Sequence, residues 1–229
     1  SNIGTIKIFE DLSKESFYKK IKKFGFGVET NISLAHEKSG DIYPFKYYLK
    51  NSRDLASASI GQSIKITNLQ LAMAYCSIAN GGYLLKPKII EKINYGTHVE
   101  QLNDTYILNR TMDSFTSKVL LSFLDETVDE GTAKNAYLEE INLGGKTGTG
   151  EIWDKDNNKY SETDFFSSFA SIFPIEDPKY VMIISIEAPE EKKKWGGESA
   201  AKCSKNIINN IIRYDEQLKF KNNIIDENA

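Results

Sequence analysis

The feature that most constrains this chain is a glycine-rich stretch at residues 144–150, which reads Gly-Gly-Lys-Thr-Gly-Thr-Gly. A phosphate-binding loop needs a further glycine upstream, with four residues between it and the Gly-Lys pair, and its lysine opens a helix. Glu140 occupies the upstream position, and the residues after Gly150 predict a polar loop and then a strand. The sequence therefore argues against a phosphate-binding loop.

Two interpretations of this stretch remain. Glycine inside a strand usually marks a place where another backbone comes close, so the stretch fits a strand edge that lies against a substrate. Alternation along such a strand puts the hydroxyls of Thr147 and Thr149 on one face, where they can hold a carboxylate. Lys146 starts on the opposite face, so its long stem or the strand twist has to bring its ammonium to the site. The alternative is a glycine-rich β-turn with an incidental lysine.

Hydrophobic periodicity predicts an α+β fold in which helices precede an antiparallel sheet closed by a terminal helix. Thr67 and Gln70 form a capping box before an apolar stripe that ends at Asn80. Residues 28–60 show no clear period. Residues 151–163 predict a solvated hairpin loop, with a loop that lines a binding cleft as the alternative. The other predicted elements are helices at 3–24 (with a break near Ser13), 113–128 and 198–214, short strands within 83–95 and 106–108, and strands at 143–149, 164–173 and 180–186.

Composition argues against several classes of function. A chain of 229 residues can bury a core without metal or disulfide, and its net charge of −3 provides no basic field for nucleic acid. His36 and His98 stand apart from any cysteine at metal-ligand spacing, so no metal site and no cofactor are expected. Cys76 and Cys203 are predicted to pack as small, buried or half-buried side chains. No apolar run reaches the roughly 20 residues that a membrane helix needs.

The order of several short motifs decides between the two interpretations of the glycine-rich stretch. Its Lys146-Thr147-Gly148-Thr149 resembles the third motif of the serine enzymes that recognise penicillin. Nearly the whole chain is similar to the transpeptidase domain of class B penicillin-binding proteins, in its C-terminal portion. The residues that carry this resemblance are Phe24-Gly25-Phe26-Gly27, Ile60-Gly61-Gln62 with Thr67 to Ala72, Ala79-Asn80-Gly81-Gly82, Gly131-Thr132-Ala133, Ser168-Phe169-Ala170, Pro178-Lys179-Tyr180 and Trp195-Gly196-Gly197.

The first residues of the chain resemble the end of the family's second motif. Ser1-Asn2-Ile3-Gly4 fits its last part, which makes Asn2 the motif's asparagine. In the family, the nucleophilic serine lies further upstream in a Ser-x-x-Lys motif. The nearest match here, Ser16 to Lys19, follows the second motif instead of preceding it and lies within a predicted helix. The resemblance therefore implies an N-terminally truncated domain without its nucleophilic serine.

The resemblance implies a penicillin-recognising serine transpeptidase fold, with an antiparallel sheet flanked by helices and an all-helical lobe. Residues 1–135 are expected to form the mainly helical lobe and its connections. Residues 136–217 are expected to hold the antiparallel strands and the C-terminal helix, and residues 218–229 to form a polar tail.

The resemblance also implies an activity and a set of site residues. The parent protein would be a peptidoglycan D,D-transpeptidase that transfers acyl groups from D-Ala-D-Ala stem peptides and reacts with β-lactams. Asn2 and Lys146 are the expected catalytic residues, and Thr147, Gly148 and Thr149 the expected substrate-binding residues. The isolated chain is expected to be inactive. A substrate that touches Asn2 and Lys146 would bring their polar atoms within about 10 Å of each other.

Location and partners follow from the same resemblance. The domain is expected on the periplasmic, outer face of the cytoplasmic membrane, anchored by an upstream helix. Stem peptides, β-lactams and other wall-synthesis or division membrane proteins are the expected partners. Whether the parent protein acts in cell division or in elongation and cell shape stays open. Two alternatives also stay open: a β-lactam sensor domain, and a non-catalytic scaffold module of a wall-synthesis complex.

Overall fold

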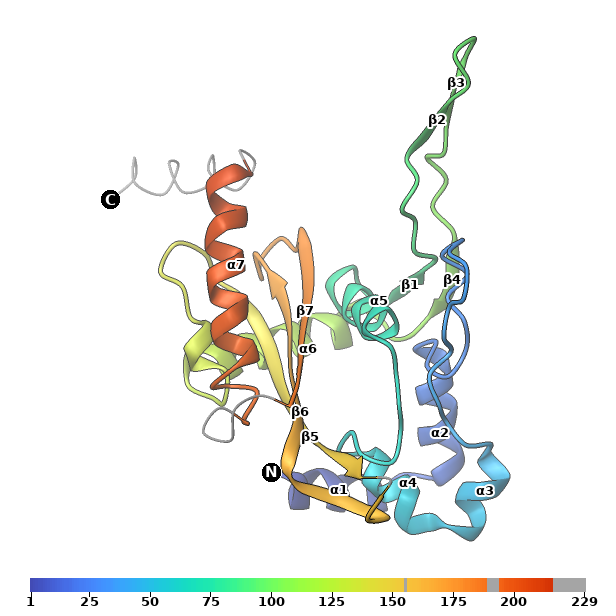
Figure 1. The fold of residues 1–229 in the computed structure, drawn as a ribbon, viewed down its shortest axis with the longest axis vertical. Helices are drawn as coiled ribbons and strands as arrows, with labels where there is room; N and C mark the ends of the chain where they lie inside the picture. Colours follow the sequence, from blue (N-terminus) through green and yellow to red (C-terminus); the bar gives the residue numbers. More distant parts are fainter. Residues whose placement is uncertain (155, 189–193, 216–229) are drawn as a thin grey trace. The chain divides into compact units, whose positions relative to one another are not determined.

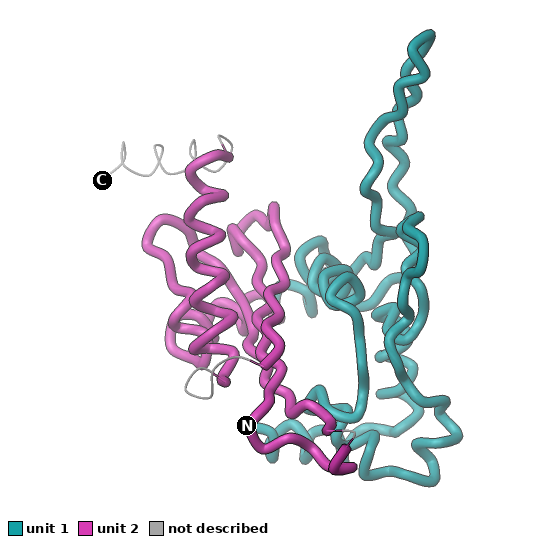
Figure 2. Tube along the Cα trace, viewed as in Figure 1, with its two compact units in different colours: residues 1–118 teal, residues 119–229 magenta. Residues whose placement is uncertain are grey.

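The computed structural model describes residues 1–154, 156–188 and 194–215 and has the α+β composition that the sequence predicts. The chain divides into two compact units, residues 1–118 and 119–229 (Figure 2). The elements of the first unit are α1 (Asn2–Glu10), α2 (Lys14–Lys23), α3 (Phe45–Lys50), α4 (Ser52–Ala58), α5 (Asn68–Ala79), β1 (Tyr83–Leu85), β2 (Lys92–Asn94), β3 (Val99–Gln101) and β4 (Ile107–Arg110). Helix α6 (Ser114–Asp129) spans the division between the units.

The predicted break in the first helical stretch is confirmed. Ser13 lies between α1 and α2 and caps α2, because its hydroxyl accepts a hydrogen bond from the Ser16 backbone N–H at 3.1 Å. A serine at this position satisfies a backbone donor that the first turn of a helix leaves free. Phe9 of α1 and Phe17 of α2 then meet edge to face, with ring centroids 5.0 Å apart.

The prediction that residues 28–60 are irregular is wrong for α3 and α4. Both helices are short, and neither has a side-chain hydrogen bond at its N-cap. They are stabilised by packing, since Tyr48 and Leu55 are fully buried in a cluster with Phe9. Helices this short are marginal in isolation and depend on tertiary contacts, so local periodicity does not reveal them.

Helix α5 begins with the predicted capping box, formed by Thr67 and Gln70. Gln70 is 1% exposed, and its side-chain amide donates to the carbonyls of Val28 and Ser39 at 2.7 and 2.8 Å. Its side-chain oxygen accepts from the Thr67 N–H at 3.1 Å. One buried side chain therefore closes the start of α5 and holds the preceding loop segments against it.

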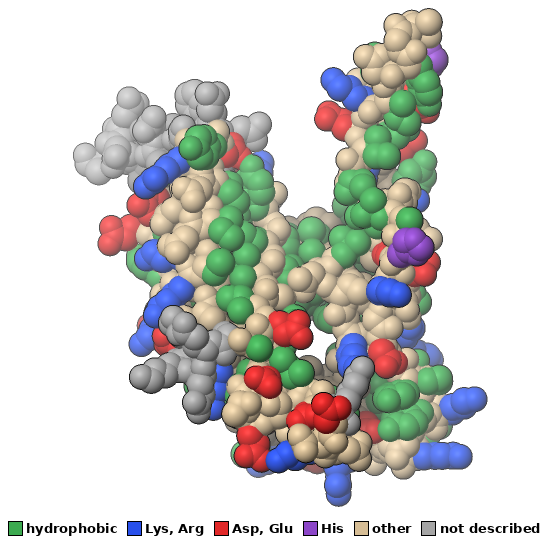
Figure 3. Space-filling view, viewed as in Figure 1, with side chains coloured by type: hydrophobic (Ala, Val, Ile, Leu, Met, Phe, Trp, Pro, Cys, Tyr) green, Lys and Arg blue, Asp and Glu red, His purple; other side chains and the backbone are tan. Residues whose placement is uncertain are grey.

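Two antiparallel pairs of short strands complete the first unit. β1 pairs with β4, and β2 pairs with β3 at the end of a long ribbon (Figure 1). Strand β3 was not predicted; it follows the turn at Gly96, where φ is +82°. Apolar and charged side chains alternate along this ribbon (Figure 3), and Ile89, Ile90 and Val99 are each at least 43% exposed.

The second unit holds the predicted three-stranded antiparallel sheet, in the order β5-β6-β7. Its elements are the 3-10 helix η1 (Lys134–Ala136), β5 (Gly144–Asp154), β6 (Lys159–Phe173), β7 (Tyr180–Glu187) and α7 (Ala200–Tyr214). The core lies between one face of the sheet and α7, where Phe169, Phe173 and Ile208 are fully buried. β7 is half-buried along most of its length.

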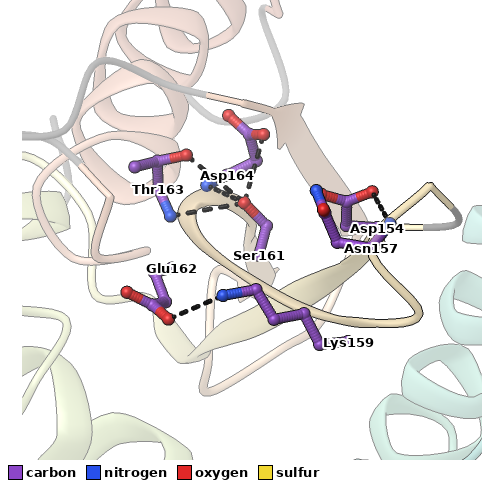
Figure 4. A network of polar contacts seen from close by, with 7 residues as sticks. All are labelled: Asp154, Asn157, Lys159, Ser161, Glu162, Thr163 and Asp164. Carbon is purple, nitrogen blue, oxygen red and sulfur yellow. Dashed lines mark hydrogen bonds and ion pairs between the residues drawn. The ribbon is translucent and has the colours of Figure 1, made fainter.

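The predicted hairpin loop at residues 151–163 is largely strand. β5 continues to Asp154 and β6 begins at Lys159, with a register shift between Glu151 and Trp153. Trp153 and Tyr160 pack edge to face across the two strands, with centroids 5.0 Å apart. Polar contacts at the hairpin end, drawn in Figure 4, join Asp154 to Asn157, Lys159 to Glu162, and Ser161 to Asp164. A cross-strand aromatic pair thus lengthens strands that polarity alone does not predict.

Two sequence expectations concern other parts of the chain. The predicted polar tail at 218–229 lies outside the described residues. Cys203 is half-buried as expected, whereas Cys76 is exposed, and both are free thiols. None of the helices in the described ranges is long and apolar enough to cross a membrane.

Gln70 supplies the first test. Replacing it by leucine leaves the carbonyls of Val28 and Ser39 without their donor, so Gln70→Leu should lower the free energy of unfolding by about 3 kcal/mol. Urea unfolding measures this loss. Thr67→Ser keeps a capping hydroxyl and serves as the control, with an expected change below about 0.5 kcal/mol. Equal effects of the two variants would contradict the role given to Gln70.

Candidate active site

The glycine-rich stretch forms the first half of β5, an outer strand of the sheet. The stretch is therefore a strand at the edge of the sheet and the turn interpretation is wrong, whereas the approach of a substrate to this edge stays a prediction. In the antiparallel register Thr147 lies opposite Phe169, and Thr149 lies opposite Ser167. Directly opposed residues share a face, so both threonines lie on the face that carries Phe169 and the core.

Each threonine hydroxyl has a defined partner. The Thr149 Oγ1 accepts a hydrogen bond from the Gly196 backbone N–H at 3.1 Å, and the Thr147 Oγ1 lies 3.0 Å from the Thr132 Oγ1. A hydroxyl has one proton to donate and two lone pairs to accept with. The Thr149 hydroxyl therefore keeps its own proton available for an acceptor such as a carboxylate.

Lys146 starts on the face of β5 opposite to the two threonines. Its ammonium donates to the carbonyl oxygen of the next residue, Thr147, at 2.8 Å. The residue is exposed to solvent, yet desolvation by the surrounding protein lowers the pKa of its ammonium. A partly desolvated cation attracts an anion more strongly than a fully hydrated one. The Lys146 ammonium thus lies at the Thr147 backbone, and its approach to the face that carries the threonine hydroxyls stays a prediction.

The glycines allow close approaches at two places. A Cβ on Gly145 would lie 2.4 Å from the Phe169 Cζ, so the core ring occupies the space that a side chain would take. A Cβ on Gly196 would lie 2.5 Å from the Gly148 oxygen and 2.6 Å from the Ser168 oxygen. The backbone of the 196–197 turn therefore lies close against this strand, whereas the predicted approach of a substrate stays a prediction.

Comparison with known proteins identifies the family. The family model described as the penicillin binding protein transpeptidase domain matches residues 1–209. The chain belongs to this family. The transpeptidase domain is 32% identical over 216 residues to the stage V sporulation protein D of Bacillus subtilis, covering 93% of this chain and 32% of that protein. It is 29% identical over 231 residues to a peptidoglycan D,D-transpeptidase FtsI homolog of Mesostigma viride, covering 93% of this chain and 38% of that protein.

Solved structures agree with this assignment. Penicillin-binding protein 3 of Mycobacterium tuberculosis in its apo form superimposes with a TM-score of 0.83 at 26% identity, covering 93% of this chain and 49% of that chain. The same protein complexed with ampicillin gives 0.78 at 25% identity, covering 93% and 48%. The chain spans about a third of the length of the two curated relatives.

Asn2 lies at the start of α1. It is the first residue of α1, it is exposed, and Ser1 before it caps the helix through a contact with the Gly4 N–H at 3.5 Å. Asn2 lies in the first unit, whereas Lys146 and Thr149 lie in the second. Their predicted proximity stays a prediction.

The Ser-x-x-Lys match at Ser16 lacks the features of an activated nucleophile. Ser16 and Lys19 lie on α2, where the Lys19 ammonium pairs with Glu15 at 2.7 Å. The Ser16 hydroxyl instead accepts from the Ser13 hydroxyl at 2.7 Å. The Lys19 ammonium therefore contacts Glu15, whereas the activation of a serine needs a base that contacts the serine hydroxyl.

A second Ser-x-x-Lys match, at Ser199 to Lys202, was missed in the sequence. It opens α7, where the Ser199 hydroxyl donates to the Trp195 carbonyl at 3.1 Å and the Lys202 ammonium pairs with Glu198 at 3.1 Å. The spacing of Ser199 and Lys202 in the sequence was sufficient to identify this match. Lys202, like Lys19, forms an ion pair with a glutamate, so neither motif match provides a lysine that contacts its serine.

The other candidate binding sites have fewer side chains that could take part in catalysis or ligand binding. A hollow of about 190 Å³ in the first unit is lined mainly by apolar side chains of Ile32, Ile89, Ile90 and Leu102. The described residues hold no group of three or more histidine, cysteine, aspartate or glutamate side chains able to bind a metal. The candidate site is therefore the β5 stretch with the residues that contact it.

The environment of Lys146 generates a pH prediction. Its pKa should lie below the ordinary 10.5, because desolvation disfavours the charged form. The folded protein then releases this proton before the unfolded chain does, so its contribution to stability rises between the lowered pKa and 10.5. NMR titration of the lysine Cε signals measures the pKa, and Lys146→Arg identifies the signal by its disappearance. A midpoint at or above the ordinary value would contradict the desolvation of this ammonium.

Proposed function

We propose that the protein carrying this domain is a peptidoglycan D,D-transpeptidase that cross-links D-Ala-D-Ala stem peptides. The observation that supports this most is the arrangement on β5, where two threonine hydroxyls share one face and a partly desolvated lysine lies beside them. The family membership and the name of the Mesostigma viride relative point to the same chemistry.

In this proposal, β5 binds the C-terminal carboxylate of the stem peptide. The hydroxyls of Thr147 and Thr149 donate to the carboxylate oxygens, and the Lys146 ammonium adds positive charge. Hydrogen bonds to an ionised acceptor are about twice as strong as neutral ones. Gly148 lies between the threonines, where the Ser168 hydroxyl occupies the space that a side chain would take, and it is proposed to contact the peptide through its backbone.

The acyl transfer itself needs a nucleophilic serine. The serine oxygen attacks the carbonyl carbon of the penultimate D-Ala, the C–N bond breaks, and the terminal D-Ala leaves with a proton on its amine. The amine of a neighbouring stem peptide then attacks the ester and releases the serine. The Thr149 N–H is the proposed oxyanion donor. Asn2 is proposed to orient the substrate amide and the catalytic lysine.

We assign the nucleophile to a Ser-x-x-Lys motif in the upstream part of the parent protein. The two matches within the described residues have lysines that pair with Glu15 and Glu198. The parent protein is further proposed to act at the periplasmic face of the cytoplasmic membrane, with an upstream anchoring helix. Other wall-synthesis or division membrane proteins are its proposed partners.

β-Lactams are the proposed inhibitors of the same site. A penicillin carries a carboxylate next to its reactive carbonyl, which matches the hydroxyls of Thr147 and Thr149 and the charge of Lys146. Penicillin-binding protein 3 of Mycobacterium tuberculosis, whose fold this chain shares, has been solved with ampicillin bound. The sensor alternative would also bind β-lactams but would not release D-Ala from stem peptides. The scaffold alternative would do neither.

Covalent labelling tests the proposal. The full-length parent protein should become labelled by a fluorescent penicillin, and should release D-Ala from a stem pentapeptide. The 229-residue chain alone should remain unlabelled, because binding groups without a nucleophile cannot form an acyl-enzyme. Full-length protein blocked beforehand with ampicillin is the control. Label that survives denaturation on the isolated chain would overturn the assignment of the nucleophile, and an unlabelled full-length protein would overturn the proposed function.

A further inference from the structure

The turn before α7 packs directly on the candidate site. Residues 195–199 form this turn, in which the Trp195 carbonyl accepts from the backbone N–H groups of Glu198 and Ser199 at 2.8 and 3.2 Å. The backbone N–H of Gly196, the residue after Trp195, donates a hydrogen bond to the Thr149 hydroxyl at 3.1 Å. One lone pair of the Thr149 oxygen is therefore occupied by a backbone group, which restricts where its proton can point.

The turn is held close to β5 and to the loop at Thr132. Gly196 is buried, and a side chain there would collide with the carbonyl oxygens of Gly148 and Ser168. A Cβ on Gly197 would lie 2.5 Å from the Thr132 carbonyl oxygen. This close packing sets the distance between the turn and β5. Because glycines have no side chains that interlock with the strand, packing alone does not prevent the turn from sliding along it.

Asn135 supplies the lateral anchor. Its side-chain amide donates to the Gly197 carbonyl at 2.8 Å and to the Glu198 carboxylate at 3.2 Å. Asn135 is half-buried in η1, whose neighbours Ala133 and Ala136 are fully buried in the core. The anchor is thus attached to a rigid part of the unit. Thr132, in the same loop, contacts the Thr147 hydroxyl at 3.0 Å.

These contacts close a ring between the two threonines of the site. It runs from Thr147 to Thr132, along the chain to Asn135, across to the 196–197 turn, and back to Thr149. Every hydrogen bond of the ring joins residues of the second unit. A hydroxyl that accepts from a fixed donor is preorganised to donate in one direction, which reduces the cost of binding a carboxylate.

We propose that Asn135 is a positioning residue for the Thr149 hydroxyl: it holds the 196–197 turn so that the Gly196 N–H directs the Thr149 O–H toward the substrate carboxylate. Asn135 touches no reacting atom and acts only through the turn. The identity of the carboxylate rests on the proposed function, whereas the anchoring of the turn does not.

Acylation kinetics of the full-length protein with a fluorescent penicillin test the proposal. Asn135→Ala should lower the second-order acylation rate constant about three- to tenfold, and Thr149→Val about ten- to hundredfold. Because Asn135 acts through Thr149, adding Asn135→Ala to Thr149→Val should change the rate constant less than about twofold. Asn142→Ala is the matched control, since it removes the same amide from a pair with Glu176 at the other end of β5, and it should leave the rate unchanged.

Hydrogen exchange of the Gly196 amide gives a readout that needs no activity. Exchange should accelerate in Asn135→Ala and in Thr149→Val but not in Asn142→Ala. Should Asn135→Ala fail to fold, the isosteric Asn135→Asp removes the same donors. Multiplicative rate effects in the double variant, or unchanged Gly196 exchange in the Asn135 variant, would overturn the proposal. A protein that penicillin does not acylate would overturn the proposed function, and the exchange measurement would still decide the role of Asn135.

Discussion

The register of β5 on β6 is the constraint on which the site depends. The fully buried Phe169 ring fills the space that Gly145 leaves, and Thr147 lies directly opposite Phe169. A slip of β5 by one residue would turn both threonines to the other face of the sheet and place Lys146 on the face that carries Phe169. The same contact that buries the core therefore aims the two hydroxyls, so stability and site geometry have a common origin.

The electrostatics of the site follow from this placement. The Lys146 ammonium donates a hydrogen bond to the Thr147 carbonyl, and desolvation by the surrounding protein lowers the pKa of this ammonium. Desolvation weakens the charged state but strengthens its attraction for an anion. The 196–197 turn adds a backbone donor beside the Thr149 hydroxyl. In the proposed function, the binding of a carboxylate therefore depends on the edge strand together with the turn that packs on it.

Local sequence signals predicted the elements that depend on local chemistry. The capping box at Thr67, the break at Ser13 and the three sheet strands follow from caps and periodicity. Helices α3 and α4 were missed because burial of Tyr48 and Leu55, and not capping, stabilises them. The candidate site was predicted only in part. The sequence motif points to Thr149, but it does not reveal that the backbone N–H of Gly196, 47 residues further along the chain, donates a hydrogen bond to its hydroxyl.

The central claim is that the hydroxyls of β5 bind the carboxylate of the acyl donor. A crystal structure of the full-length protein acylated by penicillin tests it most directly. The account predicts that carboxylate oxygens of the ligand lie within about 3.2 Å of both the Thr147 and the Thr149 Oγ1 atoms. A carboxylate bound elsewhere, with both hydroxyls beyond hydrogen-bond distance, would contradict the account.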